Sequence, residues 1–273
     1  MRPLLQVENL EVVFPGPGQG TPVLDGLDLA LHPREILGLV GESGCGKSVL
    51  ARTLLRLEAP ARIVAGSIRL AGVELTGRSR RQMRSIRGRW ITLAIQNPDG
   101  AMDPLYPMAR QFREVYAPAP GTFTWKKEKT AWQEHLFRRL REVGIGSPEE
   151  RCRQYPHQWS RGMLQRAQLV MVFAARPRVV ILDEITSALD STVILQILGL
   201  IRRLRRQYGS AIILITHDLA VAGEICDRIA VMCRGRIVEQ GPAPEVLARP
   251  KHPYTGMLVD GCRPGTDPAA GMA

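Results

Sequence analysis

The segment GESGCGKS at residues 41–48 follows a compact apolar run, EILGLV, and precedes a stretch whose apolar residues have helical spacing. It fits the pattern G-x-x-x-x-G-K-[ST], in which glycines let backbone N–H groups approach a phosphate closely. In this pattern Lys47 reaches the β- and γ-phosphates and the hydroxyl of Ser48 binds Mg²⁺. A buried strand, this loop and a helix in sequence predict a site for ATP and Mg²⁺. The residues of the predicted site are Gly41, Glu42, Ser43, Gly44, Cys45, Gly46, Lys47 and Ser48.

The segment VVILDE at residues 179–184 places two neighbouring acids at the end of a second apolar run. Asp183 is predicted to hold Mg²⁺ through water, and Glu184 to polarise the water that attacks the γ-phosphate. Two acids can also simply end a strand before the helix expected over 191–207. The apolar run and its distance from the phosphate loop favour the catalytic interpretation.

Hydrophobic periodicity indicates an α/β protein with three kinds of sequence pattern along the chain. Half-buried strands with intervening turns occupy the first 75 residues or so. Residues 97–165 have the pattern of an inserted helical segment. Beyond them, strand-like runs alternate with helical ones, which predicts a mainly parallel sheet with crossover helices.

Length and composition allow one large domain or two small ones, since the chain has 273 residues of which 45% are hydrophobic. No run approaches the roughly 18 apolar residues of a membrane span, and the N-terminus lacks the unbroken apolar stretch of a signal peptide. Five cysteines without a CxxC pair are typical of free thiols in a reducing compartment. We therefore expect a cytosolic chain that works at a membrane only through a partner.

The formal net charge of +11 comes largely from arginine clusters between 78 and 89 and between 202 and 206. Such clusters can mark a nucleic-acid surface, or they can be solvated helix faces that can face anionic lipid. Because Trp90 is the one aromatic residue among these arginines, we favour the second interpretation and expect no nucleic-acid partner.

Three further segments complete a set with the two above: AIQNP at 94–98, WSRGMLQR at 159–166 and ITHD at 215–218. SALD at 187–190, shortly after VVILDE, belongs to the same set. In this order and spacing the set resembles the ATP-binding subunit of an ABC transporter, over nearly the whole chain. The resemblance implies a P-loop NTPase fold with a RecA-like core, an N-terminal antiparallel β subdomain and an inserted α-helical subdomain. The implied division is 1–96 with 166–245 for the core, 97–165 for the helical subdomain and 246–273 for a C-terminal tail.

The resemblance also implies roles for single residues. Gln96 would contact Mg²⁺ and the attacking water, and His217 the γ-phosphate. Asp190 would lie where two such subunits meet. Phe14 would stack on adenine, with a simple core role as the alternative. The segment that binds the γ-phosphate of ATP held by the opposite subunit would be Ser160, Arg161, Gly162 and Met163.

Two positions depart from the family pattern. Ile185 replaces the proline that usually follows the glutamate, which removes no catalytic group. Arg161 replaces the first glycine of the serine–glycine–glycine signature. If the backbone there needs a positive φ, arginine strains it by roughly 1–3 kcal/mol; if not, an extra cation beside phosphate is tolerated or helpful. Our hypothesis is that this half-site is weakened.

Within the family, RPKHPYTGML at 249–258 and QNPDGAMDPLYPM at 96–108 resemble the nickel and peptide (Nik/Dpp/Opp) importer ATPases. GMLQR at 162–166 and the lack of a cysteine-rich C-terminal extension favour the NikD-like nickel branch, or a related metal–chelate importer, over peptides. The implied partners are two transmembrane permease subunits, a sister ATP-binding subunit and an extracytoplasmic solute-binding protein. The implied location is the cytoplasmic face of the bacterial inner membrane.

Two other functions compete with this one. A soluble ABC ATPase acting in DNA repair or on ribosomes would need a coiled-coil insertion or a second ATPase domain, and the sequence shows neither. A regulatory subunit that binds ATP without hydrolysing it is suggested by Arg161. The presence of Lys47, Asp183, Glu184 and His217 argues for hydrolysis instead.

Overall fold

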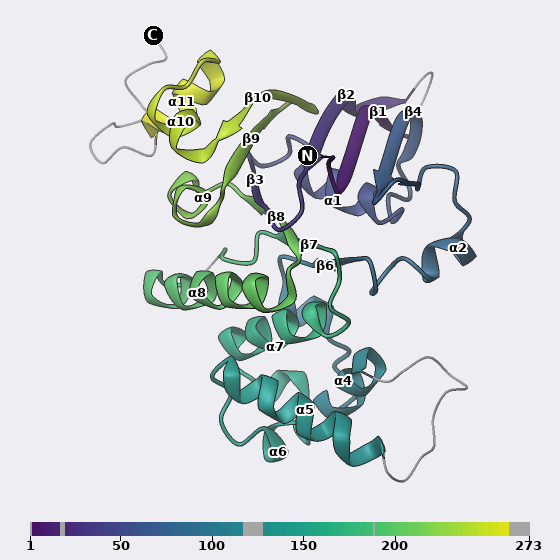
Figure 1. The fold of residues 1–273 in the computed structure, drawn as a ribbon, viewed down its shortest axis with the longest axis vertical. Coiled ribbons are helices and arrows are strands. Elements are labelled where there is room, and N and C mark those ends of the chain that lie inside the picture. The colour runs from purple at the N-terminus through teal and green to yellow at the C-terminus, as the bar shows by residue number, and fades with distance from the viewer. Residues whose placement is uncertain (1, 17–19, 117–127, 188, 262–273) are drawn as a thin grey trace.

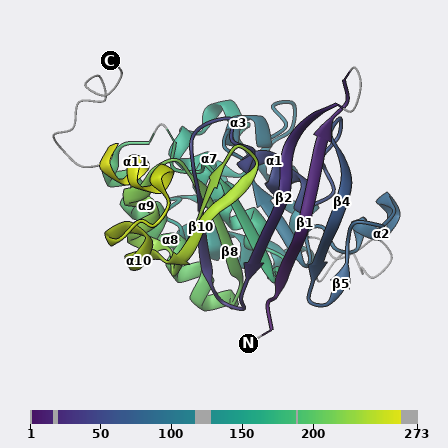
Figure 2. The same cartoon turned by 90° about the horizontal axis from the view of Figure 1, so that it is seen from above.

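The computed structural model describes residues 2–16, 20–116, 128–187 and 189–261. Two β-sheets lie at one end of the molecule, and the helices α4, α5 and α6 lie at the other (Figure 1). Figure 2 shows the strands of the smaller sheet side by side, with β10 of the larger sheet beside them.

The smaller sheet is antiparallel and has the strand order β2-β1-β4-β5. Its strands are β1 (Leu5–Phe14), β2 (Thr21–Leu31), β4 (Arg62–Leu70) and β5 (Val73–Glu74). Buried and less buried residues alternate along β1 and β2, as expected for strands with one face in the core. The half-buried strands predicted from the sequence are therefore confirmed.

The larger sheet has the order β10-β9-β3-β8-β7-β6, and its strands run parallel except β10. Strands β3, β7 and β8 are buried along their whole length, which explains their continuous apolar sequences. The strands are β3 (Ile36–Val40), β6 (Ile91–Ala94), β7 (Val179–Asp183), β8 (Ala211–Thr216), β9 (Arg228–Cys233) and β10 (Arg236–Pro242).

Helices connect these strands and form the inserted part of the chain. Those of the core and the C-terminal part are α1 (Lys47–Leu54), α2 (Arg80–Arg84), α8 (Ser191–Tyr208), α9 (Leu219–Ile225), α10 (Ala243–Ala248) and α11 (Pro253–Gly261). Those of the insertion are α3 (Pro98–Ala101), α4 (Met108–Tyr116), α5 (Glu128–Glu142), α6 (Pro148–Arg151), a 3₁₀ turn at Pro156–Gln158 and α7 (Arg161–Phe173).

Two hydrophobic clusters cover the two faces of the larger sheet. One cluster joins α1 and the antiparallel sheet to one face, and the other joins α7, α8 and the C-terminal helices to the opposite face. Because both faces are covered, the ends of the parallel strands are the part of this sheet where functional groups can reach solvent.

The predicted architecture of an α/β core, an antiparallel β part and inserted helices matches the observed elements. Two of the predicted boundaries, 165/166 and 245/246, fall inside helices α7 and α10. The division into subdomains stays a prediction. Residues 262–273 of the predicted tail, with Cys262, lie outside the described residues. None of the helices in the described ranges has the length and hydropathy of a bilayer-spanning segment.

Candidate functional site

The loop at residues 41–48 leaves the carboxyl end of β3 and enters α1, as its sequence predicts. Gly41 has a φ of 153°, and a Cβ atom there would lie 2.2 Å from the carbonyl oxygen of Met232. Gly46 has a φ of 110° at the N-cap of α1. Both positions exclude a side chain, Gly41 because the loop passes close over β9 and Gly46 because it lies against Met232 of β9 and Val23 of β2.

Lys47 is 4% exposed and lies inside the curve of the loop. Its Nζ atom donates hydrogen bonds to the carbonyl oxygens of Gly41 and Glu42, both at 2.7 Å. The ammonium group is therefore already held at the centre of the loop, where the N-terminus of α1 also favours an anion.

Ser48 and Asp183 come together although they are 135 residues apart in the sequence. The hydroxyl of Ser48 donates to Oδ1 of Asp183 at 3.1 Å. Burial raises the pKa of Asp183, which is 7% exposed, and the hydrogen bond from Ser48 acts in the opposite direction. A hydroxyl and a buried carboxylate are oxygen ligands that suit Mg²⁺, so these residues fit that cation.

Glu184 is the centre of a second cluster. Nε2 of Gln96, just beyond β6, donates to Oε2 of Glu184 at 2.7 Å, and Nδ1 of His217, just beyond β8, lies 3.7 Å from the same oxygen. Glu184 itself has a φ of 46°, a left-handed conformation that strains a residue with a side chain. Strain of this kind is concentrated at functional sites, and here it accompanies three side chains that sequence motifs had selected.

Two contacts hold the loop from outside. The N–H of Gly235, in the turn between β9 and β10, donates to the carbonyl of Cys45 at 3.0 Å. The N–H of Glu42 donates to the hydroxyl of Tyr254 in α11 at 3.1 Å.

Burial raises the pKa of the Cys45 thiol, which makes it a poor nucleophile. Cys45, Cys152, Cys226 and Cys233 are free thiols, as predicted.

The segment at 160–163 forms the exposed N-terminus of α7. Ser160 is the N-cap, and its Oγ accepts a hydrogen bond from the N–H of Met163 at 3.3 Å. Arg161 is the first residue of the helix and is not among the residues with a positive φ. The strain alternative for Arg161 is therefore wrong, because a helical backbone accommodates arginine at this position. Backbone strain at Arg161 is therefore not a cause of the weakening that we hypothesised for this half-site.

Asp190 and Phe14 have clear structural roles in this chain. Asp190 caps α8, with Oδ1 accepting from the N–H of Val193 at 3.0 Å. Phe14 ends β1 and packs, partly buried, against the cluster between the two sheets. Their predicted contacts with a second subunit and with adenine stay predictions.

Comparison with known proteins places the chain in a family. A family model described as ABC transporter matches residues 24–187, which include the phosphate loop, the signature segment and the paired acids. The chain belongs to the ABC transporter family. It is an ATPase of the kind that is coupled to transport, and its fold is that of the P-loop ATPase cassettes, as predicted.

Relatives of this ABC ATPase include transport ATP-binding proteins. It is 41% identical over 259 residues to a probable peptide ABC transporter ATP-binding protein, y4tR, of Sinorhizobium fredii, covering 94% of this chain and 76% of the relative. It is 37% identical over 261 residues to the dipeptide transport ATP-binding protein DppD of Bacillus subtilis, covering 95% and 76%.

Solved structures show the same fold. MJ0796, a bacterial ABC transporter cassette solved as a dimer, superposes with a TM-score of 0.76 at 19% identity, covering 88% of this chain and 98% of that one. CbiO1 of Clostridium perfringens, part of a cbiONQ transporter complex, has a TM-score of 0.74 at 25% identity, covering 91% and 92%.

The ABC ATPase brings Lys47, Ser48, Asp183, Glu184, Gln96 and His217 to neighbouring strand ends of one sheet. Their individual roles stay predictions. Sequence analysis missed Tyr254 as a neighbour of the loop. The segment HPYT at 252–255 contains this tyrosine, but it served above only to indicate the branch of importer ATPases that the chain resembles.

Proposed function

We propose that this chain is the ATP-hydrolysing subunit of a bacterial ABC import complex that energises peptide uptake across the cytoplasmic membrane. The observation that carries the proposal is the convergence of four distant motifs at the carboxyl ends of β3, β6, β7 and β8. Ligands of parallel α/β sheets bind at this edge.

Each side chain of the site has its own role in ATP hydrolysis. Lys47 neutralises the β- and γ-phosphates, and the loop amides orient them. Ser48, Asp183 and Gln96 would hold Mg²⁺, which supplies positive charge to the phosphate oxygens when bound. Glu184 orients the attacking water and receives its proton, while His217 lies beside it, facing the γ-phosphate.

A second ATP-binding subunit completes each site. The N-terminus of α7 is exposed on the inserted part of the chain, and α7 buries its opposite face in the core cluster. Exposed helix N–H groups with Ser160 suit the phosphates of ATP held by a sister subunit. Closure on ATP and opening after hydrolysis would then change the state of the permease.

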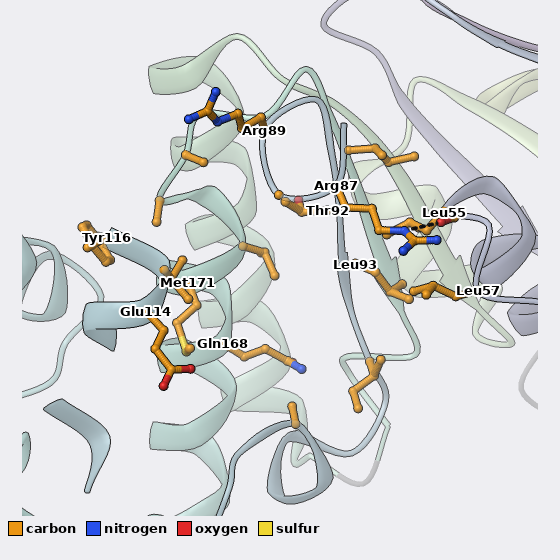
Figure 3. A pocket seen from close by; sticks show the side chains of 18 of the residues that line it. Leu55, Leu57, Arg87, Arg89, Thr92, Leu93, Glu114, Tyr116, Gln168 and Met171 are labelled. Atoms are coloured by element: carbon orange, nitrogen blue, oxygen red, sulfur yellow. Dashed lines mark hydrogen bonds between the residues drawn. The ribbon is translucent and has the colours of Figure 1, made fainter. Parts of the chain in front are cut away.

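A groove between the core and the inserted helices supports a permease partner. The groove has a volume of about 850 Å³ (Figure 3). Met171 and Gln168 of α7 lie on one side of it and Leu93 and Leu57 on the other, with Gln168 pointing into the space between them. Oε1 of Gln168, a side chain only 4% exposed, has no hydrogen-bond partner within the described residues.

The rim of this groove is basic, with Arg84, Arg87 and Arg89 against a single acid, Glu114. Apolar walls and a basic rim suit a short segment of a permease that carries apolar residues and an acid. This partner would bring the chain to the cytoplasmic face of the inner membrane, with a solute-binding protein on the other side.

The relatives favour peptide as the substrate. Several of them, from different bacteria, carry names of peptide, oligopeptide or dipeptide transport ATP-binding proteins. Nickel, which the sequence had favoured, receives no support from them. Its remaining motivation is the variant signature GMLQR at 162–166, so nickel is the second candidate.

Uptake in cells that lack this chain tests the proposal. Cells are rescued with the native chain, with Lys47→Ala, or with Arg153→Ala, which changes an exposed arginine as a matched control. Labelled dipeptide and radiolabelled nickel are supplied in parallel. We expect dipeptide uptake with the native chain and with Arg153→Ala, and none with Lys47→Ala.

Nickel uptake restored without dipeptide uptake would contradict the peptide assignment and retain the importer. A Leu57→Asp variant tests the groove, because Leu57 is 46% exposed at its edge, where a charged side chain reaches solvent. We expect Leu57→Asp to bind ATP normally and to lose uptake, whereas Val64→Asp, an exposed apolar residue of β4, keeps both.

A further inference from the structure

The C-terminal helix reaches back to the phosphate loop through one side chain. Tyr254 lies 212 residues beyond Glu42, and its hydroxyl oxygen accepts the N–H of Glu42 at 3.1 Å. Burial raises the pKa of the Tyr254 phenol, so it is a neutral hydroxyl at physiological pH. The segment from 249 to 261 is therefore in direct contact with the predicted ATP site.

The peptide group between Gly41 and Glu42 is held from both sides. Its carbonyl oxygen, that of Gly41, accepts a hydrogen bond from Nζ of Lys47 at 2.7 Å, and its N–H donates to Tyr254. This peptide marks the start of the loop, where Gly41 passes too close to Met232 for any side chain. Its orientation sets the direction in which the following amides point.

The two contacts on this peptide do not persist equally. In the proposed site the ammonium of Lys47 also binds the β- and γ-phosphates, which weakens its hydrogen bond to the carbonyl of Gly41. Tyr254 lies on the other side of the peptide and does not have to move. It is then the contact that keeps the start of the loop in place.

Tyr254 is itself held by a chain of hydrogen bonds from β10. The carboxylate of Glu239 accepts the N–H of Lys251 at 3.0 and 3.1 Å and the N–H of His252 at 2.9 Å. Burial alone would raise the pKa of Glu239, and these amides reverse the effect and lower it. Nδ1 of His252 accepts the N–H of Tyr254 at 3.1 Å.

Packing fixes the rest of α11. Thr255 is fully buried and Val259 is 8% exposed, and both face the core of the protein. The tyrosine side chain therefore projects from a helix that is anchored on two sides, by Glu239 and by its buried residues. A group held in this way can position its partner, because little conformational freedom remains to be lost.

We propose that Tyr254 is a positioning residue for the phosphate loop, through which the C-terminal segment 249–261 sets the affinity of this chain for ATP. The inference rests on the proposed ATP site at 41–48. Tyr254 touches no reacting atom. Its hydroxyl fixes the Gly41–Glu42 peptide, which preorganises the amides that receive the phosphates.

Nucleotide binding to the full chain tests the inference, with displacement of the fluorescent analogue TNP-ATP by ATP as the measurement. Tyr254→Phe removes the hydroxyl and keeps the ring. We expect the Kd for ATP to rise roughly 3- to 10-fold, the range of one neutral hydrogen bond. Tyr106→Phe, at a partly exposed tyrosine of the inserted part, is the matched control and should leave the Kd unchanged.

Turnover separates positioning from a general loss of structure. Tyr254→Phe should raise the KM for ATP and leave kcat unchanged, because uniform binding is lost. A fall of kcat at constant KM, or a Kd for ATP equal to that of the native chain, would overturn the proposal. Lys47→Ala must abolish TNP-ATP binding; if it does not, the proposed site at 41–48 fails independently of Tyr254.

A double-mutant cycle tests the anchoring by Glu239. Glu239→Gln loses one of the acceptors for the amides of Lys251 and His252, and should raise the Kd for ATP in the same direction. If both residues act on one peptide, the double variant Tyr254→Phe/Glu239→Gln is no weaker than the weaker single variant. Additive effects contradict a shared path. Glu245→Gln, an exposed acid of α10, is the control.

Discussion

Asp183 is a carboxylate whose surroundings disfavour a negative charge. Burial raises its pKa, and the neighbouring Glu184 adds a like charge. The hydroxyl of Ser48 and the charges of Arg52 and Lys47 offset this only in part. An environment of this kind destabilises the charged residue until a cation binds, as expected of a metal ligand that is kept for function.

Asp183→Asn should therefore stabilise the nucleotide-free chain and remove the dependence of its Tm on Mg²⁺. The pKa of Asp183 is higher in the folded chain than in the unfolded chain. At pH values above the folded pKa the charged carboxylate therefore lowers the free energy of unfolding. This loss of stability disappears below about pH 3.8, the unfolded pKa. We expect a Tm a few degrees higher for Asp183→Asn at pH 8, with a smaller gain at pH 3.5, below the unfolded pKa of 3.8.

Differential scanning fluorimetry at both pH values measures this difference. ATP turnover should be lost in the same variant. A lower Tm at pH 8, or a gain that grows toward acid, would contradict the assignment of Asp183 as a destabilised ligand. Asp99→Asn, at an exposed acid of α3, is the control and should show neither effect.

At the scale of the element, helix α7 shows why a departure from a motif can be neutral for the backbone. Ser160 caps the helix and Arg161 occupies its first position with a helical backbone. A cation at a helix N-terminus opposes the helix dipole by about 0.3–1 kcal/mol, which is small. The same cation lies where the proposed partner's phosphates arrive.

We expect Arg161→Gln to stabilise the isolated chain slightly and to weaken ATP binding in the assembled dimer by roughly 2- to 5-fold, because an exposed cation–anion pair is lost. Arg161→Lys should retain most of the affinity. The measurement is the ATP concentration for half-maximal turnover of the assembled complex at low and high salt.

Screening by salt should shrink the difference between native and Arg161→Gln complexes. Tighter ATP binding by Arg161→Gln would instead support a weakened half-site caused by the arginine charge. Because the backbone at Arg161 is helical and unstrained, relief of strain explains neither outcome.

For the whole molecule, the two halves of the predicted site lie on different parts of the chain. The strand ends carry Lys47, Asp183 and Glu184, and the signature segment opens α7 on the inserted part (Figure 1). In the proposed dimer, two subunits arranged head to tail would bring these halves together with ATP in the interface. Hydrolysis would then remove the γ-phosphate that joins the halves.

Glu184→Gln keeps the side chain's size and removes its ability to accept a proton. Turnover of the assembled complex should fall by at least about 100-fold, the contribution of a general base. ATP should also hold two isolated ATP-binding subunits together, which size-exclusion chromatography with light scattering detects as a stable dimer. Unchanged turnover would favour a regulatory subunit that does not hydrolyse ATP.

Local sequence patterns were enough to predict the fold class, the family and most of the candidate site. Phosphate loops and paired acids require given residue types at given spacings, because glycine conformations and the distance from an amide to a phosphate are local properties. Continuous apolar runs likewise predicted the buried strands β3, β7 and β8, whose burial on both faces leaves no alternation.

Contacts between groups far apart in the sequence, in contrast, become visible only in the folded chain. The hydrogen bond between Ser48 and Asp183 spans 135 residues, and that between Glu42 and Tyr254 spans 212, so neither leaves a local signal. The backbone at Arg161 and the positive φ of Glu184 are also set by packing around them. Motifs specify chemistry through local geometry, whereas contacts across the chain depend on how the sheet and its helices pack.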